Sequence, residues 1–175
     1  MKINTTRFGE INVPGVCIVR FENGLPGFAR LKKYALIPYA EESPFYILQS
    51  VSNPDLTLLL VDPYRFFNDY VFELEDGFAA RYGFTPDNQP HVFSVVTLRD
   101  EIENATVNMA APILVNWASQ TAVQLVLENS SYSLRQKLFP EGLPGQKSAK
   151  QTKQSKQQTR KQHLTSQYPQ HMEAI

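Results

Sequence analysis

Short apolar runs separated by turn residues recur along most of the chain. In residues 8–14, Ile11 and Val13 alternate with polar positions before a Pro-Gly pair. Alternation with a period of two predicts a half-buried strand, and proline with glycine predicts its end. A second apolar run at 16–21 is too short for a helix and is also predicted as a strand. Residues 22–27 have the glycine and proline content of a turn.

Longer apolar segments follow. Residues 34–39, 45–51 and 56–61 are each predicted as a strand, and the Ser-Asn-Pro-Asp stretch between the last two suits a hairpin. Residues 91–98, rich in Val and Phe, are typical of a buried central strand. Further short strands are predicted at 105–109, 113–117 and 122–127, the last two joined as a pair.

One helix is predicted at 75–82. Acidic residues begin this segment, Ala79 and Ala80 lie inside it, and Gly83 follows it directly. About eight to ten strands with one or two short helices predict a small, single-domain, mostly β body, either a β-barrel or a barrel-like sandwich.

The composition changes sharply after Pro144-Gly145. Residues 146–175 are dominated at first by Gln, Lys, Ser and Thr, and contain few apolar side chains. Such a segment cannot offset the ~1–2 kcal/mol of backbone entropy lost for each ordered residue. We therefore predict a folded domain at 1–145 and a disordered Lys/Gln-rich tail at 146–175.

The formal net charge of zero conceals a division between these two parts. Residues 1–145 contain 11 Lys and Arg against 16 Asp and Glu, a net charge of −5, whereas 146–175 have a net charge of +5. An acidic body argues against nucleic-acid binding by residues 1–145. The tail has two open interpretations: non-specific attraction to nucleic acid, or a solvated segment without a binding role.

No apolar run approaches the ~18 residues of a membrane span. The N-terminus has no apolar region after its first charges, so we expect a protein that is not exported. The lone cysteine, Cys17, lies in an apolar stretch, where a buried thiol is more common than a reactive one. These features favour a cytoplasmic location.

Sequence patterns of catalysis are missing from residues 1–145. His91 is the only histidine there, and it begins an apolar strand, where a structural role is the common case. A small hydrolase centred on His91 or Cys17 stays as a minor alternative. One cysteine and one histidine do not supply a typical metal site, and no glycine-rich phosphate loop occurs. We expect no enzyme activity, no metal and no cofactor.

Residues 64–72 are unusually aromatic and surround Asp69; the aromatic residues are Tyr64, Phe66, Phe67, Tyr70 and Phe72. Two interpretations remain open. These side chains plug one end of the barrel, or they form a protein-binding patch, since aromatic residues dominate interface hot spots.

Seven segments, taken in order, resemble the FliW family of flagellar assembly factors. They are Phe8–Ile11, Phe21–Phe28, Ser43–Ser50, Val61–Pro63, Phe66–Tyr70, Ala111–Asn116, and Gln124–Glu128 with Tyr132–Arg135. The chain departs from the family pattern at 117–123, which lacks the usual glycine and arginine, and at Gln136-Lys137, which replaces a His-Pro pair.

This resemblance implies a small β-barrel that switches between two protein partners. FliW-like proteins bind newly made flagellin in the cytoplasm and, when free of it, bind the RNA-binding translational repressor CsrA. That binding relieves repression of flagellin translation by an allosteric route. We expect a monomer when free. The alternatives are a flagellin chaperone without CsrA regulation and a nucleic-acid-associated protein that uses the tail.

Partner-binding residues are predicted from the acidic body and the matched segments. Carboxylates would steer the protein toward a basic RNA-binding partner; the candidates are Glu73, Glu75, Asp76 and Asp100. Four further candidates lie within the resemblance: Phe66, Asp69, Tyr70 and Asn116.

Overall fold

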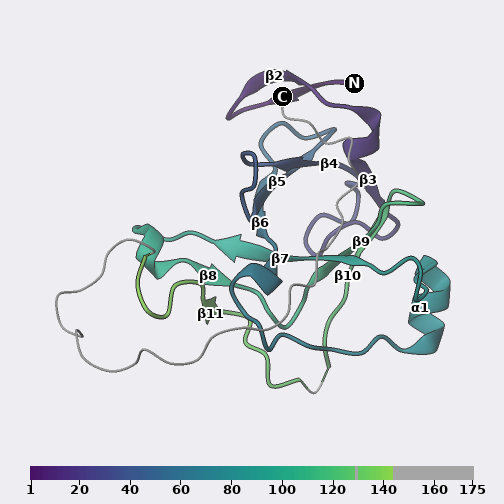
Figure 1. The fold of residues 1–175 in the computed structure, drawn as a ribbon. Helices are drawn as coiled ribbons and strands as arrows, with labels where there is room; N and C mark the ends of the chain where they lie inside the picture. Colours follow the sequence, from purple (N-terminus) through teal and green to yellow (C-terminus); the bar gives the residue numbers. More distant parts are fainter. Residues whose placement is uncertain (129, 144–175) are drawn as a thin grey trace.

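A computed structural model describes residues 1–128 and 130–143, and seven of its strands form a closed barrel (Figure 1). The barrel strands are β3 (Ile18–Phe21), β4 (Lys33–Pro38), β5 (Phe45–Ser50), β6 (Thr57–Val61), β7 (His91–Thr97), β9 (Ile113–Asn116) and β10 (Thr121–Gln124). Their order is β7-β6-β5-β4-β3-β10-β9, and β9 pairs back with β7 to close the ring. The mostly β, barrel-type fold predicted from the sequence is confirmed.

The barrel closes through pairs of strands that lie far apart in the chain. From β3 to β7 each strand pairs antiparallel with the next, including the predicted β5–β6 hairpin. Strand β10 then lies parallel to β3, with Thr121 opposite Arg20. Strand β9 lies antiparallel to β7, with Phe93 opposite Ile113. The closed ring leaves no long unpaired edge among these strands.

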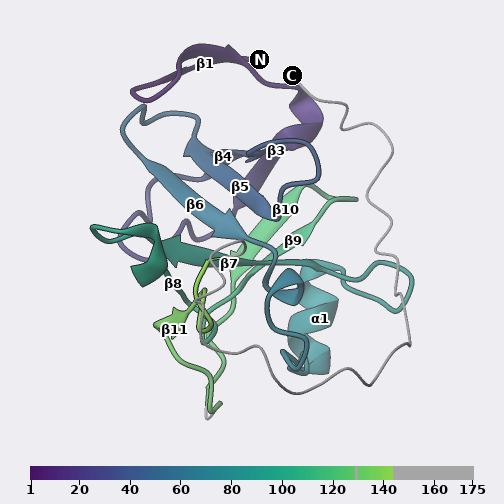
Figure 2. The same ribbon diagram turned by 60° about the vertical axis from the view of Figure 1, so that its left-hand side comes forward.

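Smaller elements surround the barrel (Figure 2). They are the hairpin of β1 (Lys2–Thr5) and β2 (Gly9–Asn12), the short strand β8 (Thr106–Val107) beside β7 with β11 (Gln136–Lys137) beside β8, and the 3-10 turns η1 (Gly15–Cys17), η2 (Pro63–Arg65) and η3 (Ile102–Asn104). The sequence analysis missed β1 and β11, because both are short and largely polar. The eleven described strands therefore exceed the predicted number.

Two predicted strands have different limits in the structure. The strand expected at 16–21 begins only at Ile18, because η1 occupies its start. The strand expected at 122–127 ends at Gln124, although Leu125 and Leu127 continue to hydrogen-bond across to Pro112 and Ala110. The predicted tail lies outside the described residues.

Helix α1 (Asp76–Tyr82) confirms the one helix predicted from the sequence. Asp76 lies in its first turn, where a carboxylate interacts favourably with the helix dipole. Gly83 ends the helix in the left-handed region at φ 69°, and its N–H donates to the carbonyls of Ala79 and Ala80. A glycine adopts this backbone conformation without the steric cost of a side chain.

The apolar side chains form three clusters. The first fills the barrel interior and includes Tyr34, Leu48 and Phe93, all nearly inaccessible to solvent. The second covers the outer face of β6, β7 and β9, because residues that alternate with the interior set point outward. The third lies beneath the β1–β2 hairpin and contains Cys17. The burial predicted for this thiol is confirmed, and burial raises its pKa.

Candidate protein-binding groove

Tyr70 anchors the aromatic segment to the outer face of the barrel. Its side chain is 2% exposed, and its hydroxyl donates a hydrogen bond of 2.8 Å to the Met109 carbonyl. Its ring contacts those of Tyr64, Phe72 and Tyr132, the last with centroids 4.7 Å apart. Burial, with the neighbouring Tyr64 and Tyr132, raises the pKa of the Tyr70 hydroxyl. The buried Tyr70 side chain therefore fixes the position of residues 64–72 on the barrel.

The aromatic segment does not plug an end of the barrel, as one interpretation of the sequence had it. Phe66, Phe67 and Phe72 pack with Tyr70 in the second cluster, on the outer side of β7 and β9. Phe66 is half-buried, and its ring centroid lies 5.8 Å from that of Phe45. Most of this aromatic surface therefore belongs to the core rather than to an open patch.

Tyr132 connects the residues after Tyr70 to the C-terminal part of the domain. The Tyr132 hydroxyl donates to the Val71 carbonyl at 2.7 Å and accepts from the Val71 N–H at 2.9 Å. One hydroxyl thereby satisfies both backbone groups of Val71. The following residues continue without helix or strand pairing until α1 begins at Asp76.

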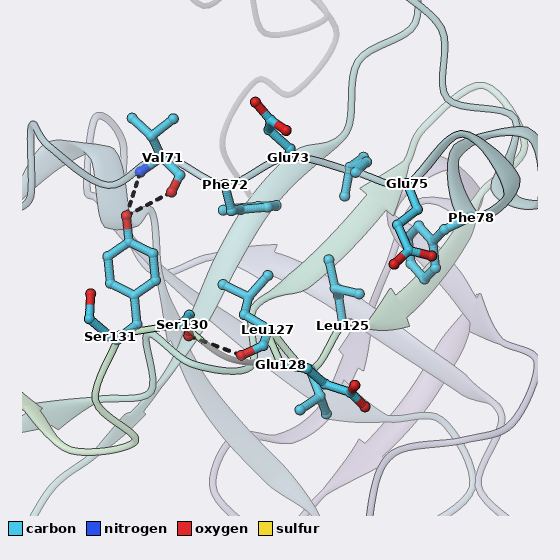
Figure 3. Close-up of a pocket in the computed structure, with 13 residues that line it drawn as sticks. Val71, Phe72, Glu73, Glu75, Phe78, Leu125, Leu127, Glu128, Ser130 and Ser131 are labelled. Carbon is cyan, nitrogen blue, oxygen red and sulfur yellow. Dashed lines mark hydrogen bonds between the residues drawn. The ribbon is translucent and has the colours of Figure 1, made fainter.

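A groove lies between residues 71–75 and 125–132 and has a volume of about 730 Å³. Its lining consists of Val71–Glu75, Phe78, Leu125–Glu128 and Ser130–Tyr132. Figure 3 shows Phe72 on one side and Leu125 and Leu127 on the other, with their side chains between the two segments. We call this feature the 71–75/125–132 groove.

The groove combines an apolar floor with an acidic rim. Phe72, Phe78, Leu125 and Leu127 are half-buried members of the second cluster and form the floor. Three exposed carboxylates lie along its edges, those of Glu73, Glu75 and Glu128, and in Figure 3 the Glu73 carboxylate points away from the floor. The lining contains no lysine and no arginine. This surface suits an apolar ligand with positive charge.

Five predicted site residues lie along one stretch of chain. Phe66 and Asp69 precede the groove, Glu73 and Glu75 line it, and Asp76 begins the helix beside it. The four carboxylates in this stretch are exposed. Four of the five predicted acidic candidates are therefore exposed between residues 69 and 76.

Asp100 and Asn116 lie elsewhere. Asp100 is exposed in the loop between β7 and β8. Asn116 is 2% exposed, and its side-chain amide donates to the Tyr82 carbonyl at 2.8 Å. Asn116 and Tyr70, both predicted as partner contacts, are instead buried residues that support α1 and the aromatic segment from below.

The sequence analysis places Glu128 and the leucines of the floor in a segment of the family resemblance but does not predict them as site residues. Leu125 and Leu127 alternate with polar or exposed neighbours, a pattern that predicts a strand and no more. No local pattern indicates that this segment lies opposite 71–75, some 50 residues earlier in the chain. Glu128 joins Glu73 and Glu75 only through the tertiary fold.

His91 and Cys17, the two residues considered for catalysis, lie on different elements: His91 begins strand β7, and Cys17 lies in the third cluster. In residues 1–128 and 130–143 no group of three or more His, Cys, Asp or Glu side chains is placed to hold a metal ion. His91 packs edge-on against Trp117, with ring centroids 6.1 Å apart. Burial lowers the pKa of His91, and the charge of Asp62 partly opposes this effect. Within the same residues, no helix is both long and apolar enough to span a membrane.

Comparison with known proteins gives consistent matches across the described domain. The family model described as "FliW protein" matches residues 2–138. A "Flagellar assembly factor FliW" of Desulfitobacterium hafniense is 43% identical over 141 residues, covering 81% of this chain and 93% of that protein. The protein of the same description from Bacillus subtilis is 36% identical over 135 residues, covering 77% of this chain and 94% of its own.

A solved structure agrees with these sequence matches. "Crystal structure of the flagellar assembly factor FliW" superposes with a TM-score of 0.74 at 34% identity and covers 82% of this chain and 100% of that chain. The similarity therefore extends through the whole length of the solved protein.

Proposed function

The chain belongs to the FliW family of flagellar assembly factors, and we propose that it switches between two protein partners. It binds newly made flagellin and, when free of flagellin, binds the RNA-binding translational repressor CsrA. Binding to CsrA relieves repression of flagellin translation by an allosteric route. Flagellin synthesis is in this way coupled to the consumption of flagellin.

The observation that supports the proposal most is the extent of the match. Relatives described as flagellar assembly factors are covered over 93% and 94% of their own length, so whole proteins correspond rather than a shared module. The family name supports a role in flagellum assembly and biogenesis. The identity of the two partners is the proposed step beyond that name.

The charge of the domain supports a basic partner. Asp69, Glu73, Glu75 and Asp76 are exposed along one stretch of chain, within a part of the protein whose net charge is −5. An RNA-binding protein is basic around its RNA site, so this acidic surface would speed encounter with CsrA and repel RNA phosphates. Asp100, on the β7–β8 loop, adds to the negative electrostatic potential of the domain but does not line the groove.

The proposed role is that of a binding protein rather than an enzyme. Both proposed partners are met in the cytoplasm, where flagellin is made and CsrA acts on messenger RNA, so the proposal includes a cytoplasmic location. It also includes a monomeric free form, because the acidic surfaces of two copies repel each other.

The test is calorimetric titration of the full chain with CsrA and with flagellin from the same organism, separately and in competition. We expect binding to both, with flagellin displacing CsrA. Binding to flagellin alone would reduce the role to that of a dedicated chaperone. Binding to neither partner would contradict the proposed function.

The acidic surface is tested with the fourfold variant Asp69→Asn, Glu73→Gln, Glu75→Gln and Asp76→Asn. We expect its CsrA affinity to fall about tenfold at low salt, as the sum of several exposed charge pairs, and to lose most of its dependence on salt. The control neutralises the same number of exposed carboxylates outside the stretch, Glu10→Gln, Glu41→Gln, Asp87→Asn and Glu101→Gln, and should change affinity less than twofold. Equal effects of the two variants would contradict the assigned surface.

A further inference from the structure

One flank of the 71–75/125–132 groove is the segment that continues from β10, and it has an open backbone donor on its free side. The N–H groups of Leu125 and Leu127 donate to the carbonyls of Pro112 and Ala110, each at 2.9 Å. Successive N–H groups of an extended chain point to opposite sides, so the N–H of Val126 points away from 110–112. The Val126 N–H has no hydrogen-bond partner among the described residues, whereas the Val126 carbonyl accepts from the Glu128 N–H at 3.1 Å. The Val126 side chain is also 63% exposed.

The opposite flank also has unused backbone groups. Tyr132 satisfies the N–H and carbonyl of Val71, but no hydrogen bond in the described part of the chain engages the backbone of Phe72, Glu73 or Leu74. A row of unpaired backbone donors and acceptors is a template for another extended chain. The groove therefore lies between two segments that both have such groups available.

The side chains of the groove define the chemistry of an occupant. Phe72, Phe78, Leu125 and Leu127 form a half-buried apolar floor, which suits the apolar face of an extended segment. The rim has the three carboxylates of Glu73, Glu75 and Glu128, with no basic residue in the lining. Alternate side chains of a strand face opposite ways, so the matching segment has apolar residues on one face and basic residues on the other.

We propose that the groove binds an extended segment of a partner protein, with alternating apolar and basic residues, by strand addition. Backbone hydrogen bonds supply part of the affinity, and the alternate side chains give specificity. This inference deepens the partner-binding function proposed above, because Glu73 and Glu75 belong to both. It adds a mode of recognition, which is a peptide segment rather than a folded surface.

Two other occupants fit the groove less well. A second copy of this chain would bring an acidic domain of net charge −5 against an acidic rim. The chain's own residues 146–162 are basic but contain one alanine and no larger apolar residue for the floor, whereas residues 163–175 contain apolar residues but no lysine or arginine. A partner segment with both chemistries matches the floor and the rim together.

The first experiment measures fluorescence anisotropy of a labelled eight-residue peptide in which Lys and Thr alternate with Val and Leu, titrated with the full chain. Three comparison peptides replace every Lys by Glu, methylate alternate backbone nitrogens, or reproduce residues 146–162. We expect saturable binding of the first peptide only, at least tenfold tighter than of the others. Equal binding of the methylated peptide would overturn strand addition. Tighter binding of the 146–162 peptide would overturn a partner segment in favour of the chain itself.

Two pairs of variants locate the binding site. Val126→Pro removes the open N–H, whereas Val126→Ala keeps it, and we expect only the proline variant to weaken the peptide at least fivefold. The triple variant Glu73→Gln, Glu75→Gln and Glu128→Gln should weaken it about tenfold at low salt. Its matched control neutralises three exposed carboxylates outside the groove, namely Glu10→Gln, Glu41→Gln and Glu101→Gln. Equal losses within either pair would overturn the assigned site.

The same variants separate this inference from the proposed function. Peptide binding that depends on Val126 and the rim, together with no binding of CsrA or flagellin, would support the groove and contradict the partner switch. Normal binding of both proteins, with no peptide bound, would support the switch and overturn the groove.

Discussion

The side-chain amide of Asn116 donates a hydrogen bond to the Tyr82 carbonyl at 2.8 Å and thereby joins the end of helix α1 to barrel strand β9. The same nitrogen lies 3.3 Å from the Gly83 carbonyl, and the Asn116 side-chain oxygen accepts from the Ser119 N–H at 3.2 Å. One buried amide therefore satisfies backbone groups of the helix and of the β9–β10 turn. This arrangement positions α1, and with it one end of the groove.

Asn116→Ala should lower the free energy of unfolding by about 1–3 kcal/mol, because it leaves buried backbone groups without a partner. Urea unfolding followed by circular dichroism measures the change. Asn68→Ala, at an exposed position, is the control and should stay within about 0.5 kcal/mol of the parent. A similar loss in both variants would show that the Asn116 amide has no special role.

Tyr34→Phe should leave the free energy of unfolding unchanged or raise it by about 1 kcal/mol. Tyr34 is fully buried, and its hydroxyl has no hydrogen-bond partner among the described residues, so phenylalanine removes an unpaired polar group and keeps the ring contact with Phe21. Tyr70→Phe is the matched comparison and should cost about 1 kcal/mol, since it loses the hydrogen bond to Met109. Chemical unfolding measures both variants. A Tyr34→Phe variant less stable than Tyr70→Phe would contradict these assignments.

Gly24→Ala should destabilise the domain by roughly 2–3 kcal/mol. Gly24 has φ of +70°, and a Cβ there would lie 2.6 Å from the Phe28 carbonyl oxygen, a backbone atom that cannot move aside easily. Gly15→Ala is the control, because nothing lies within 4 Å of the added atom. Thermal unfolding compares the two, and an unchanged melting temperature in Gly24→Ala would rule out the strained turn.

Stability should fall as the pH drops below about 6.5 because of His91. Burial lowers the pKa of His91 in the folded protein below its ordinary value of 6.5, so the unfolded chain binds more protons in this range. The stability that the burial of neutral His91 allows is fully present above pH 6.5. It is lost as the pH falls from 6.5 toward the pKa of His91 in the folded protein. The free energy of unfolding changes with pH by at most about 1.4 kcal/mol per pH unit for this one group.

Urea unfolding between pH 5.5 and 7.5 measures this dependence, and His91→Gln should flatten it. Asp62, whose charge opposes the shift, provides a second check. Asp62→Asn should lower the folded pKa of His91 further and extend the loss of stability to lower pH. An unchanged pH profile in His91→Gln would assign the dependence to other groups.

Most local elements of this protein could be predicted from its sequence. Apolar runs bounded by turn residues located the β5–β6 hairpin and the central strand β7, since burial on a pleated strand requires that pattern. The helix at Asp76–Tyr82 followed from its acidic start and from Gly83, which alone tolerates the left-handed end without strain. Family motifs in the chain then indicated the kind of barrel.

The closure of the ring and the position of the groove depend on contacts between residues far apart in the chain. The parallel pairing of β10 with β3 joins residues about 100 positions apart, and no local periodicity specifies such a contact. Periodicity likewise shows that a residue faces a core, but not which core. Tyr70 and Asn116, both predicted as partner-binding residues, lie buried, whereas Glu128 lies opposite Glu73 and Glu75 only because the folded barrel brings 125–132 opposite 71–75.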